Sequence, residues 1–343
     1  MQKKLIALAV AGLISNGAFA ADNSVTVYGS FDAGLRNLSD ANAAGQSLTS
    51  MDSSGTFHSN RLGFKGVEGL GNGQNAHFDL ESGFTSGSGT LAGNLWGRTA
   101  SVGLGGSWGS LDLGRQYTTM FQVASAYDPF NYKYTGIIPV SALDGSRRDN
   151  DVQYTGTFGA VTARLEHALG QVPGSTAAGS TTEGGLSFDN GPLSLGTAYA
   201  TGKDASNTLT TNYWTVGGAY KTGPLRVALG YGNKKADQLG GTSGETKNWW
   251  LGGSYAMTPA AALTVAYYDT KTSNVVVATT NPLGIEGQTK LFVLGGTYSM
   301  SKRTTLYAGV DHHNLEGSSV LGYGTAQTQG SQTGVSVGID HSF

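Results

Sequence analysis

The amino-acid sequence predicts an all-β protein, a transmembrane antiparallel β-barrel of about sixteen strands. Segments of about ten residues alternate between apolar and polar side chains, which is the period of a strand with one apolar face. Short turns between these segments alternate with long polar loops, as in barrels that cross a membrane. Composition agrees, because glycine accounts for 54 of 343 residues and charged residues for 13%, about twice and about half of average usage.

The N-terminus carries the pattern of a secretory signal peptide. Lys3 and Lys4 precede an apolar run, and a small-residue motif follows that ends at Ala20. The run is too short for a membrane-spanning helix, which needs roughly 17 to 25 apolar residues. We therefore expect residues 1–20 to be cleaved on export, which leaves a barrel domain of residues 21–343. The chain has no cysteine, so disulfides do not support this domain.

Sixteen strands are predicted along the chain, with two kinds of connection between them. Asn190-Gly191 and Thr222-Gly223 are examples of short turns, and the short turns alternate with loops of roughly ten to thirty residues. An even number of strands places both chain ends on the same side of the membrane. The predicted strands lie near residues 24–37, 58–68, 74–85, 95–105, 109–117, 147–157, 160–168, 182–189, 192–201, 211–221, 224–234, 245–257, 261–272, 288–299, 302–313 and 332–343.

The last predicted strand shows most clearly which face is apolar. One face carries Thr333, Val335, Val337, Ile339, His341 and Phe343, and the other carries Gly334, Ser336, Gly338, Asp340 and Ser342. We expect the first face to contact lipid, because a charged residue such as Asp340 would cost a few kcal/mol there. The same alternation would also suit a soluble β-sandwich. Small and polar residues recur on the second face of strand after strand, however, and this favours a wet lumen.

Charge and motifs argue against several other classes of protein. Without Lys3 and Lys4 the chain has 19 basic against 23 acidic residues, whereas a nucleic-acid-binding protein would show a basic excess. Asp311-His312-His313 suggests a metal site, but adjacent strand residues point to opposite faces, so both imidazoles cannot easily bind one ion. The sequence has no nucleophile elbow and no phosphate-binding loop. We expect no cofactor and no metal, although Ca²⁺ at loop carboxylates, which the sequence does not place, stays an open alternative.

Several segments of the sequence resemble one known family. They are Ser24-Val25-Thr26-Val27-Tyr28-Gly29, Asn60-Arg61-Leu62-Gly63-Phe64-Lys65-Gly66, Leu80-Glu81-Ser82-Gly83-Phe84, Arg98 to Leu104, and Leu113-Gly114-Arg115-Gln116-Tyr117. They are similar to segments of the Gram-negative general porins of the Burkholderia, Comamonas and Neisseria group. The segments are spread in order over about the first third of the chain, and the strand rhythm and the terminal Phe343 extend the resemblance to its full length.

The resemblance implies a homotrimer of sixteen-stranded barrels in the outer membrane of a Gram-negative bacterium, in contact with lipid and lipopolysaccharide. Each barrel would be a water-filled channel for passive diffusion of ions and small hydrophilic solutes. The third external loop, here about Thr118 to Ser146, would fold into the lumen and form a constriction. The C-terminal Phe343 would be recognised by the machinery that assembles outer-membrane barrels.

Charges that face the narrowest part of such a channel would set its selectivity. Counting alternate residues places Arg61 and Lys65 of the second strand in the lumen, with Asp32 on the first strand and Asp149 on the strand after the third loop. Arg61 is the best single candidate. The alternative for Arg61 is a rim position or a wall salt bridge that has no effect on flux.

In related porins an arginine cluster on the barrel wall faces acidic groups on the third loop. The residues at similar positions here are Arg61, Arg98 and Arg147 or Arg148 on the wall, with Asp128 and Asp144 on the loop. Arg98 conflicts with simple alternation, because it shares its parity with the apolar residues that follow it. Either a bulge turns Arg98 into the lumen or it lies at the trimer interface.

The expected selectivity depends on which charges dominate. The arginine candidates favour a modest preference for anions, whereas the net charge of −4 without Lys3 and Lys4 favours cations. Local charge should prevail at the narrow point, because screening reaches only about 8 Å at physiological salt. Two other classes stay open. A barrel enzyme would need a nucleophile or an acid pair within reach of a base on the wall, and an adhesive or structural barrel would have a plugged lumen.

Overall fold

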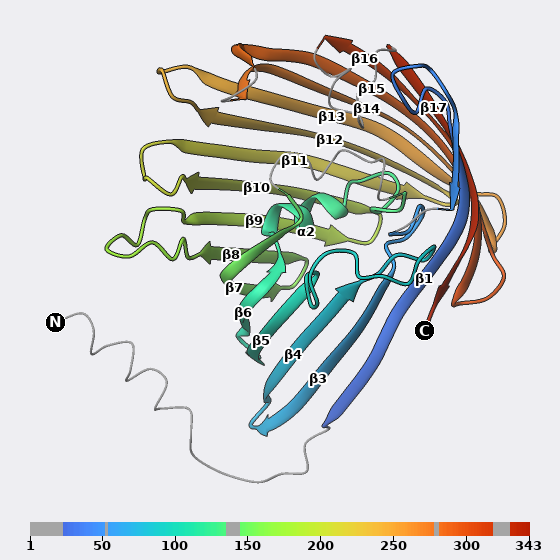
Figure 1. The fold of residues 1–343 in the computed structure, drawn as a ribbon. Helices are drawn as coiled ribbons and strands as arrows, with labels where there is room; N and C mark the ends of the chain where they lie inside the picture. Colours follow the sequence, from blue (N-terminus) through green and yellow to red (C-terminus); the bar gives the residue numbers. More distant parts are fainter. Residues whose placement is uncertain (1–22, 52–53, 135–144, 278–280, 318–329) are drawn as a thin grey trace.

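The computed structural model describes residues 23–51, 54–134, 145–277, 281–317 and 330–343. Within these residues the chain forms seventeen β-strands and one α-helix, and the strands join into one sheet that closes on itself. Figure 1 shows the curved wall of strands, with the helix α2 on its inner side. The all-β barrel predicted from the sequence is confirmed.

The strands follow one another around the barrel in chain order, and each pairs antiparallel with its neighbours. Their bounds are β1 Ser24–Leu38, β2 Leu48–Met51, β3 Arg61–Gly71, β4 Gln74–Gly83, β5 Thr99–Gly106, β6 Gly109–Tyr117, β7 Arg147–Phe158, β8 Val161–Ala168, β9 Thr181–Asn190, β10 Leu193–Lys203, β11 Thr210–Thr222, β12 Leu225–Asp237, β13 Ser243–Ala256, β14 Ala261–Val277, β15 Asn281–Ser299, β16 Thr304–Gly317 and β17 Ser331–Ser342. The helix α2 is Thr119–Ser125.

β1 closes the barrel because it pairs along both of its edges. From Ser24 to Ser30 it lies antiparallel to β3, and from Ser30 to Leu38 it lies antiparallel to β17. The short strand β2 pairs with the end of β1 and belongs to the first long connection. The described part of the chain therefore holds sixteen long strands, as predicted, and one addition. β2 has only four residues, which is too few to show a period in the sequence.

β14 and β15 extend further than the sequence predicts. The apolar alternation ends near residues 272 and 288, but the two strands continue to Val277 and from Asn281. Their backbones stay paired in this region, with register irregularities between Thr272 and Val277. An extended hairpin beyond the apolar band has no need of apolar residues, so its strands show no alternation.

The predicted division into two faces is confirmed on β17. Val335, Val337 and Ile339 are exposed on the outer face, whereas Ser336 and Asp340 are buried on the inner face. Side chains alternate along each strand, and register partners on neighbouring strands lie on the same face. The division into an outer and an inner face therefore continues around the wall. The outer face is the one suited to lipid.

Aromatic side chains gather on the outer face near the end that carries the long loops. Trp249 is exposed there, its ring lies 5.3 Å from that of Tyr267, and Phe292 is the register partner of Tyr267. The adjacent Trp250 points inward and is buried, because neighbouring residues of a strand point to opposite faces. Such bands are typical of the membrane interface of outer-membrane barrels.

The connections at the other end of the barrel are short. Gly191, for example, makes the turn between β9 and β10 with φ 61°, in the left-handed region that favours glycine. Within the described residues, no helix has the length and the apolar character needed to cross a membrane.

Candidate functional site

The third long connection enters the barrel, as the family resemblance implied. Its described part, residues 118–134, places α2 against the inner wall made by β8 to β11 (Figure 1). Val123 and Tyr127 are fully buried there, and wall glycines make room for them. A Cβ on Gly217 would lie 2.2 Å from the Tyr127 ring, and one on Gly196 would lie 2.7 Å from Val123. The wall is therefore shaped to seat this loop.

Charged side chains of the wall hold both ends of α2, with acids at its start and a base at its end. Glu166 and Glu183 accept hydrogen bonds from the N–H groups of the first two residues of the helix. At the other end Arg226 donates to the carbonyl oxygen of Ala126 at 2.7 Å. Helix ends leave such N–H and C=O groups without partners, and the helix dipole favours acids at its start and bases at its end. The three side chains thus fix the helix against the inner wall.

Asp128 ties the next part of the loop to the wall. Its carboxylate accepts hydrogen bonds from the Tyr268 hydroxyl at 2.8 Å and from the N–H groups of Phe130 and Tyr132 at 3.1 and 2.8 Å. Burial raises the pKa of Asp128 to about 6. The carboxylate is fully buried, so Asp128 anchors the loop. The sequence-based expectation placed Asp128 in the channel, facing the wall arginines, and the side chain does not lie there.

A segment of the first long connection also lies inside the barrel. Asp32 accepts the N–H groups of Phe57 and His58 at 2.7 and 2.6 Å and the hydroxyl of Tyr307 at 2.6 Å. The amide oxygen of Asn60 accepts the N–H of Asp32. Asp32 points inward as predicted, but it is buried and holds this segment, so it does not meet the solvent of the lumen.

Three arginines gather around one carboxylate beside the loop. Arg98 Nε donates to Glu81 Oε1 at 2.6 Å, and Arg61 Nη1 lies 3.7 Å from Glu81 Oε2. Arg98 and Arg147 both donate to the Tyr117 hydroxyl, at 2.9 and 2.7 Å. The Arg147 guanidinium also lies 4.3 Å from the centroid of the Tyr117 ring. Within this group, three positive charges share one negative charge.

Arg148 and Arg36 also form ion pairs on the inner face, and in each pair the arginine is more exposed than the carboxylate. Arg148 lies 3.1 Å from Glu166 and 3.3 Å from Glu183, and Arg36 lies 2.7 Å from Asp311. In these pairs and in those with Glu81, the arginine side chains are 13–20% exposed and the carboxylates 0–5%. A solute in the lumen therefore meets guanidinium groups, because the carboxylates lie behind them.

The structure settles the orientation of two candidates. Arg98 precedes β5 and its ladder, so alternation does not fix its direction, and its side chain turns inward to the cluster. The inward orientation predicted for Asp149 is wrong, because its side chain is 66% exposed and pairs with Arg115 at 2.6 Å. The register of β6 and β7 shifts between Gly114 and Gln116, and such a bulge reverses the parity of the residues beyond it.

The remaining predicted site residues, Lys65, Asp144 and Asp128, do not join the arginines around Glu81 in the described part of the chain. Lys65 is exposed on the inner face, with Nζ 5.4 Å from the centroid of the Tyr28 ring. Asp144 lies outside the described residues. The family resemblance pairs wall arginines with loop acids, but the one described loop acid, Asp128, is bound to Tyr268 of the wall and lies near Arg226, which is not one of the predicted arginines.

Sequence reasoning missed three residues where the first and third long connections meet inside the barrel. Phe57 and His58 come from the first long connection, and Lys133 comes from the third, with its Nζ 5.2 Å from the centroid of the Phe57 ring. They lie in loops, where no period reveals which way a side chain points. The usable signal is the aromatic-rich stretch from Phe130 to Tyr134, which is unusual for a polar loop.

The polar groups inside the barrel do not form a catalytic relay. Ser30 Oγ lies 2.9 Å from His58 Nδ1 and donates directly to Asp340, and the same Nδ1 faces Asp340 at 3.3 Å. A relay would need the serine and the acid on different ring nitrogens. Within the described ranges, no cluster of three His, Cys, Asp or Glu residues is arranged to hold a metal ion.

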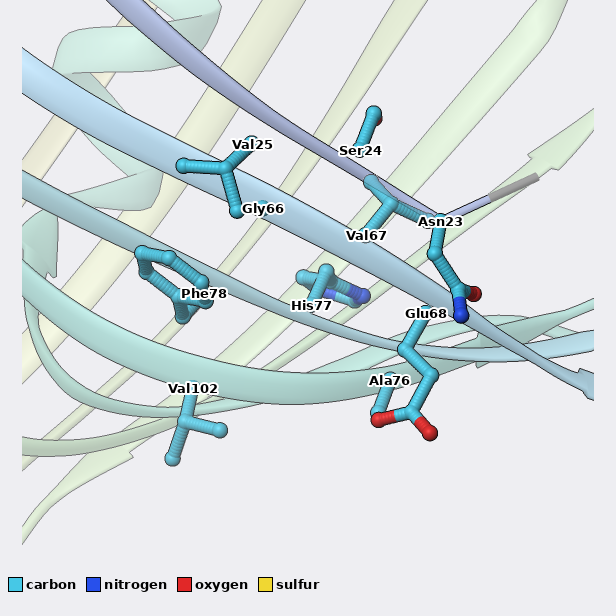
Figure 2. Close-up of a pocket in the computed structure, with 10 residues that line it drawn as sticks. All are labelled: Asn23, Ser24, Val25, Gly66, Val67, Glu68, Ala76, His77, Phe78 and Val102. Carbon is cyan, nitrogen blue, oxygen red and sulfur yellow. The ribbon is translucent and has the colours of Figure 1, made fainter.

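A cavity of about 490 Å³ lies away from the arginines, across the ends of β1, β3, β4 and β5. Figure 2 shows the residues that line it, among them Val25, Phe78 and Val102. Val25 and Val102 are exposed on the outer face of the barrel, and His77, which also lines the cavity, turns its ring to Asp112 at 2.7 Å. The cavity therefore belongs to the outer wall and is no entrance for a solute.

Comparison with protein families and curated proteins gives consistent matches. The family model described as Gram-negative porin matches residues 7–318. The chain is 31% identical to the outer membrane porin protein 32 of Delftia acidovorans, with all of both chains covered. It is 32% identical to an outer membrane porin protein of Bordetella pertussis, over 70% of this chain and 71% of that one.

Solved structures agree with the sequence matches. An anion-selective porin from Comamonas acidovorans superposes with a TM-score of 0.78 at 26% identity, and the match covers 94% of this chain and all of that one. The OmpT protein of Vibrio cholerae superposes with a TM-score of 0.69 at 16% identity, over 96% of this chain and all of that one. This second likeness concerns the fold alone.

Proposed function

Because the chain belongs to the Gram-negative porin family and is a channel protein of the outer membrane, we propose that ions and small hydrophilic solutes cross it by passive diffusion, with a preference for anions. The exposure of the inner ion pairs supports the preference most directly. Arg61, Arg98 and Arg148 face the water of the lumen, and their carboxylate partners lie behind them. Charges at close range to the permeating ion govern selectivity.

The reversal potential in a salt gradient tests the anion preference. Purified protein in planar bilayers under a tenfold KCl gradient should show a potential of the sign expected for chloride preference. Arg61→Gln and Arg98→Gln should each lower the ratio of chloride to potassium permeability, because each removes a charge from the cluster. Arg115→Gln is the matched control, since Arg115 pairs with the exposed Asp149 outside the cluster. A potassium preference in the native protein would overturn the proposal.

Assembly and export complete the proposal. Residues 1–20 would be removed on export, and three copies of the mature chain would form the working unit. Phe343 would serve as the recognition end for barrel assembly. Its backbone pairs with Gly29 and its ring stays exposed, which supports this role. Conductance that rises in steps of three equal levels would support the trimer, and single independent steps would argue against it.

Two lysines on the outer face support contact with lipopolysaccharide. Lys247 and Lys271 are direct register partners on β13 and β14, just beyond the aromatic band. Like charges directly opposite each other destabilise a sheet. Glu245 lies 3.0 Å from Lys247, but Lys271 has no ion pair among the residues that the structure describes. A phosphate group of a neighbouring lipopolysaccharide between the two lysines would relieve this repulsion.

We propose no catalytic function for this barrel. The group of Ser30, His58 and Asp340 is the nearest approach to a catalytic arrangement, and its hydrogen bonds do not form a relay. Ser30 is also buried, so a substrate in the lumen would not reach its hydroxyl. Absence of ester or peptide cleavage by the purified protein would agree with this proposal, and hydrolysis abolished by Ser30→Ala would contradict it.

A further inference from the structure

The first and third long connections hold each other inside the lumen. The N–H of Tyr134 donates to the carbonyl oxygen of Phe57 at 2.7 Å. The Phe57 ring stacks on Tyr307 of the wall, with centroids 5.0 Å apart, and meets the Tyr134 ring edge to face at 5.2 Å. Asp32 holds the same segment because it accepts the N–H of Phe57 at 2.7 Å. Phe57 is therefore a rigid contact between the wall and both connections.

This contact positions one cation of the third loop. Lys133 Nζ lies 5.2 Å from the centroid of the Phe57 ring, within the range of a cation–π interaction. No carboxylate of the described residues lies within ion-pair distance of Lys133. Burial lowers the pKa of Lys133, and the nearby Arg61 lowers it further, while Asp340 and Asp32 raise it. Lys133 is thus close enough to Arg61 for their charges to interact.

The surroundings of Lys133 leave its charge available to the lumen. Lys133 is only half-buried, so part of the side chain faces water. The two acids that attract it are less accessible, because Asp32 and Asp340 are buried and are occupied by other donors. Burial lowers the pKa of His58 below its ordinary value, and the positive charges of Lys133 and Arg61 lower it further. At neutral pH His58 is therefore uncharged.

We propose that Lys133 determines selectivity from the loop side of the constriction, so that permeating ions pass between this lysine and the wall arginine Arg61. The proposal rests on the anion preference proposed above and extends it. The family resemblance led us to expect acidic groups on the loop facing basic groups on the wall. Here the loop acid Asp128 is turned into the wall, and the loop presents a cation. Positive charge then lies on both sides of the path.

The test is a comparison of charge variants in planar bilayers under a tenfold KCl gradient. Lys133→Met should lower the ratio of chloride to potassium permeability by about tenfold, because a charge about 6 Å away changes anion and cation permeation about threefold each, in opposite directions, even in water. Lys133→Glu should lower the ratio further, and Lys133→Arg should keep it. The matched control is Lys302→Met, since Lys302 is exposed in the turn between β15 and β16.

The possible outcomes separate this inference from the proposed function. If Lys133→Met and Lys133→Glu leave the ratio unchanged while Arg61→Gln lowers it, the inference is wrong and the anion-selective channel stands. If the native protein prefers potassium, both fail together. Phe57→Leu provides a second variant should Lys133→Met assemble poorly. It keeps an apolar contact but removes the ring face, and it should lower the ratio less than Lys133→Met does; an unchanged ratio would count against the role of Phe57.

Discussion

Removal of the Asp128 side chain tests how the loop is held in the lumen. In Asp128→Ala the Tyr268 hydroxyl and the N–H groups of Phe130 and Tyr132 lose their common acceptor. A buried donor without an acceptor costs about 1–3 kcal/mol. Because such losses are not additive for neighbouring groups, we take about 4–6 kcal/mol as the total cost for the three donors.

The charge of Asp128 makes an opposing contribution. Burial raises its pKa to about 6, about two units above the ordinary value, so keeping the carboxylate charged at neutral pH costs the native state about 3 kcal/mol. Asp128→Ala regains this part. We therefore expect the variant to weaken the contact between loop and wall by about 1–3 kcal/mol. Asp128→Asn should weaken it less, because the amide keeps a carbonyl acceptor and carries no charge.

The direction of the pH dependence follows from the same shift. A carboxyl group with a raised pKa stabilises the native state most below its ordinary pKa near 4, and this stabilisation is lost as the pH rises to about 6. The loop of the native protein should therefore be held more tightly at pH 4 than at pH 7. Asp128→Asn should lose the part of this dependence that comes from Asp128.

Two measurements report how often the loop leaves its seat. A weakening of about 1–3 kcal/mol raises the released fraction roughly fivefold to 150-fold, which should appear as excess current noise in single channels. Limited proteolysis of detergent-solubilised protein should cut Asp128→Ala faster than the native chain, with Asp128→Asn in between. If the three proteins give the same noise and the same cleavage rate, the anchoring role of Asp128 is refuted.

Three other residue positions give shorter tests. As the pH falls through the pKa of His58, which burial lowers, the ring gains a charge and the chloride preference should rise; His58→Gln should abolish the rise. Gly217→Val would place its Cβ 2.2 Å from the Tyr127 ring, and should displace the loop and raise conductance; unchanged conductance would contradict the seat. Lys247→Gln with Lys271→Gln should reduce the lipopolysaccharide that copurifies with the protein, and equal amounts would argue against the phosphate contact.

The strands were predictable because the membrane imposes a period on them. Along β17, Val337 and Ile339 must face outward and Ser336 inward, and the structure agrees. The same rule explains why the neighbours Trp249 and Trp250 lie on opposite faces. The rule fails where the ladder is interrupted. Asp149 lies inside a register shift, and a bulge leaves no mark in the order of apolar and polar residues.

The loops were not predictable from alternation, because their side chains obey contacts and not a period. Asp32 and Asp128 look like lumen charges in the sequence, but both accept backbone N–H groups of the loops. A sequence cannot distinguish an acid that faces water from one that faces a loop backbone. The wall glycines pose the same problem, because Gly196 and Gly217 suit a wide lumen equally well and in fact seat Val123 and Tyr127.

These contacts explain why net charge is a poor guide to selectivity in this barrel. Folding two connections into the lumen creates backbone N–H groups that need acceptors away from bulk water, and wall carboxylates such as Glu166 and Glu183 meet that need. Each carboxylate used in this way is buried, and the arginine that accompanies it is left on the water side, as Arg148 is beside both acids. An excess of acidic residues in the chain is therefore compatible with a lumen surface that is positive where it is narrow.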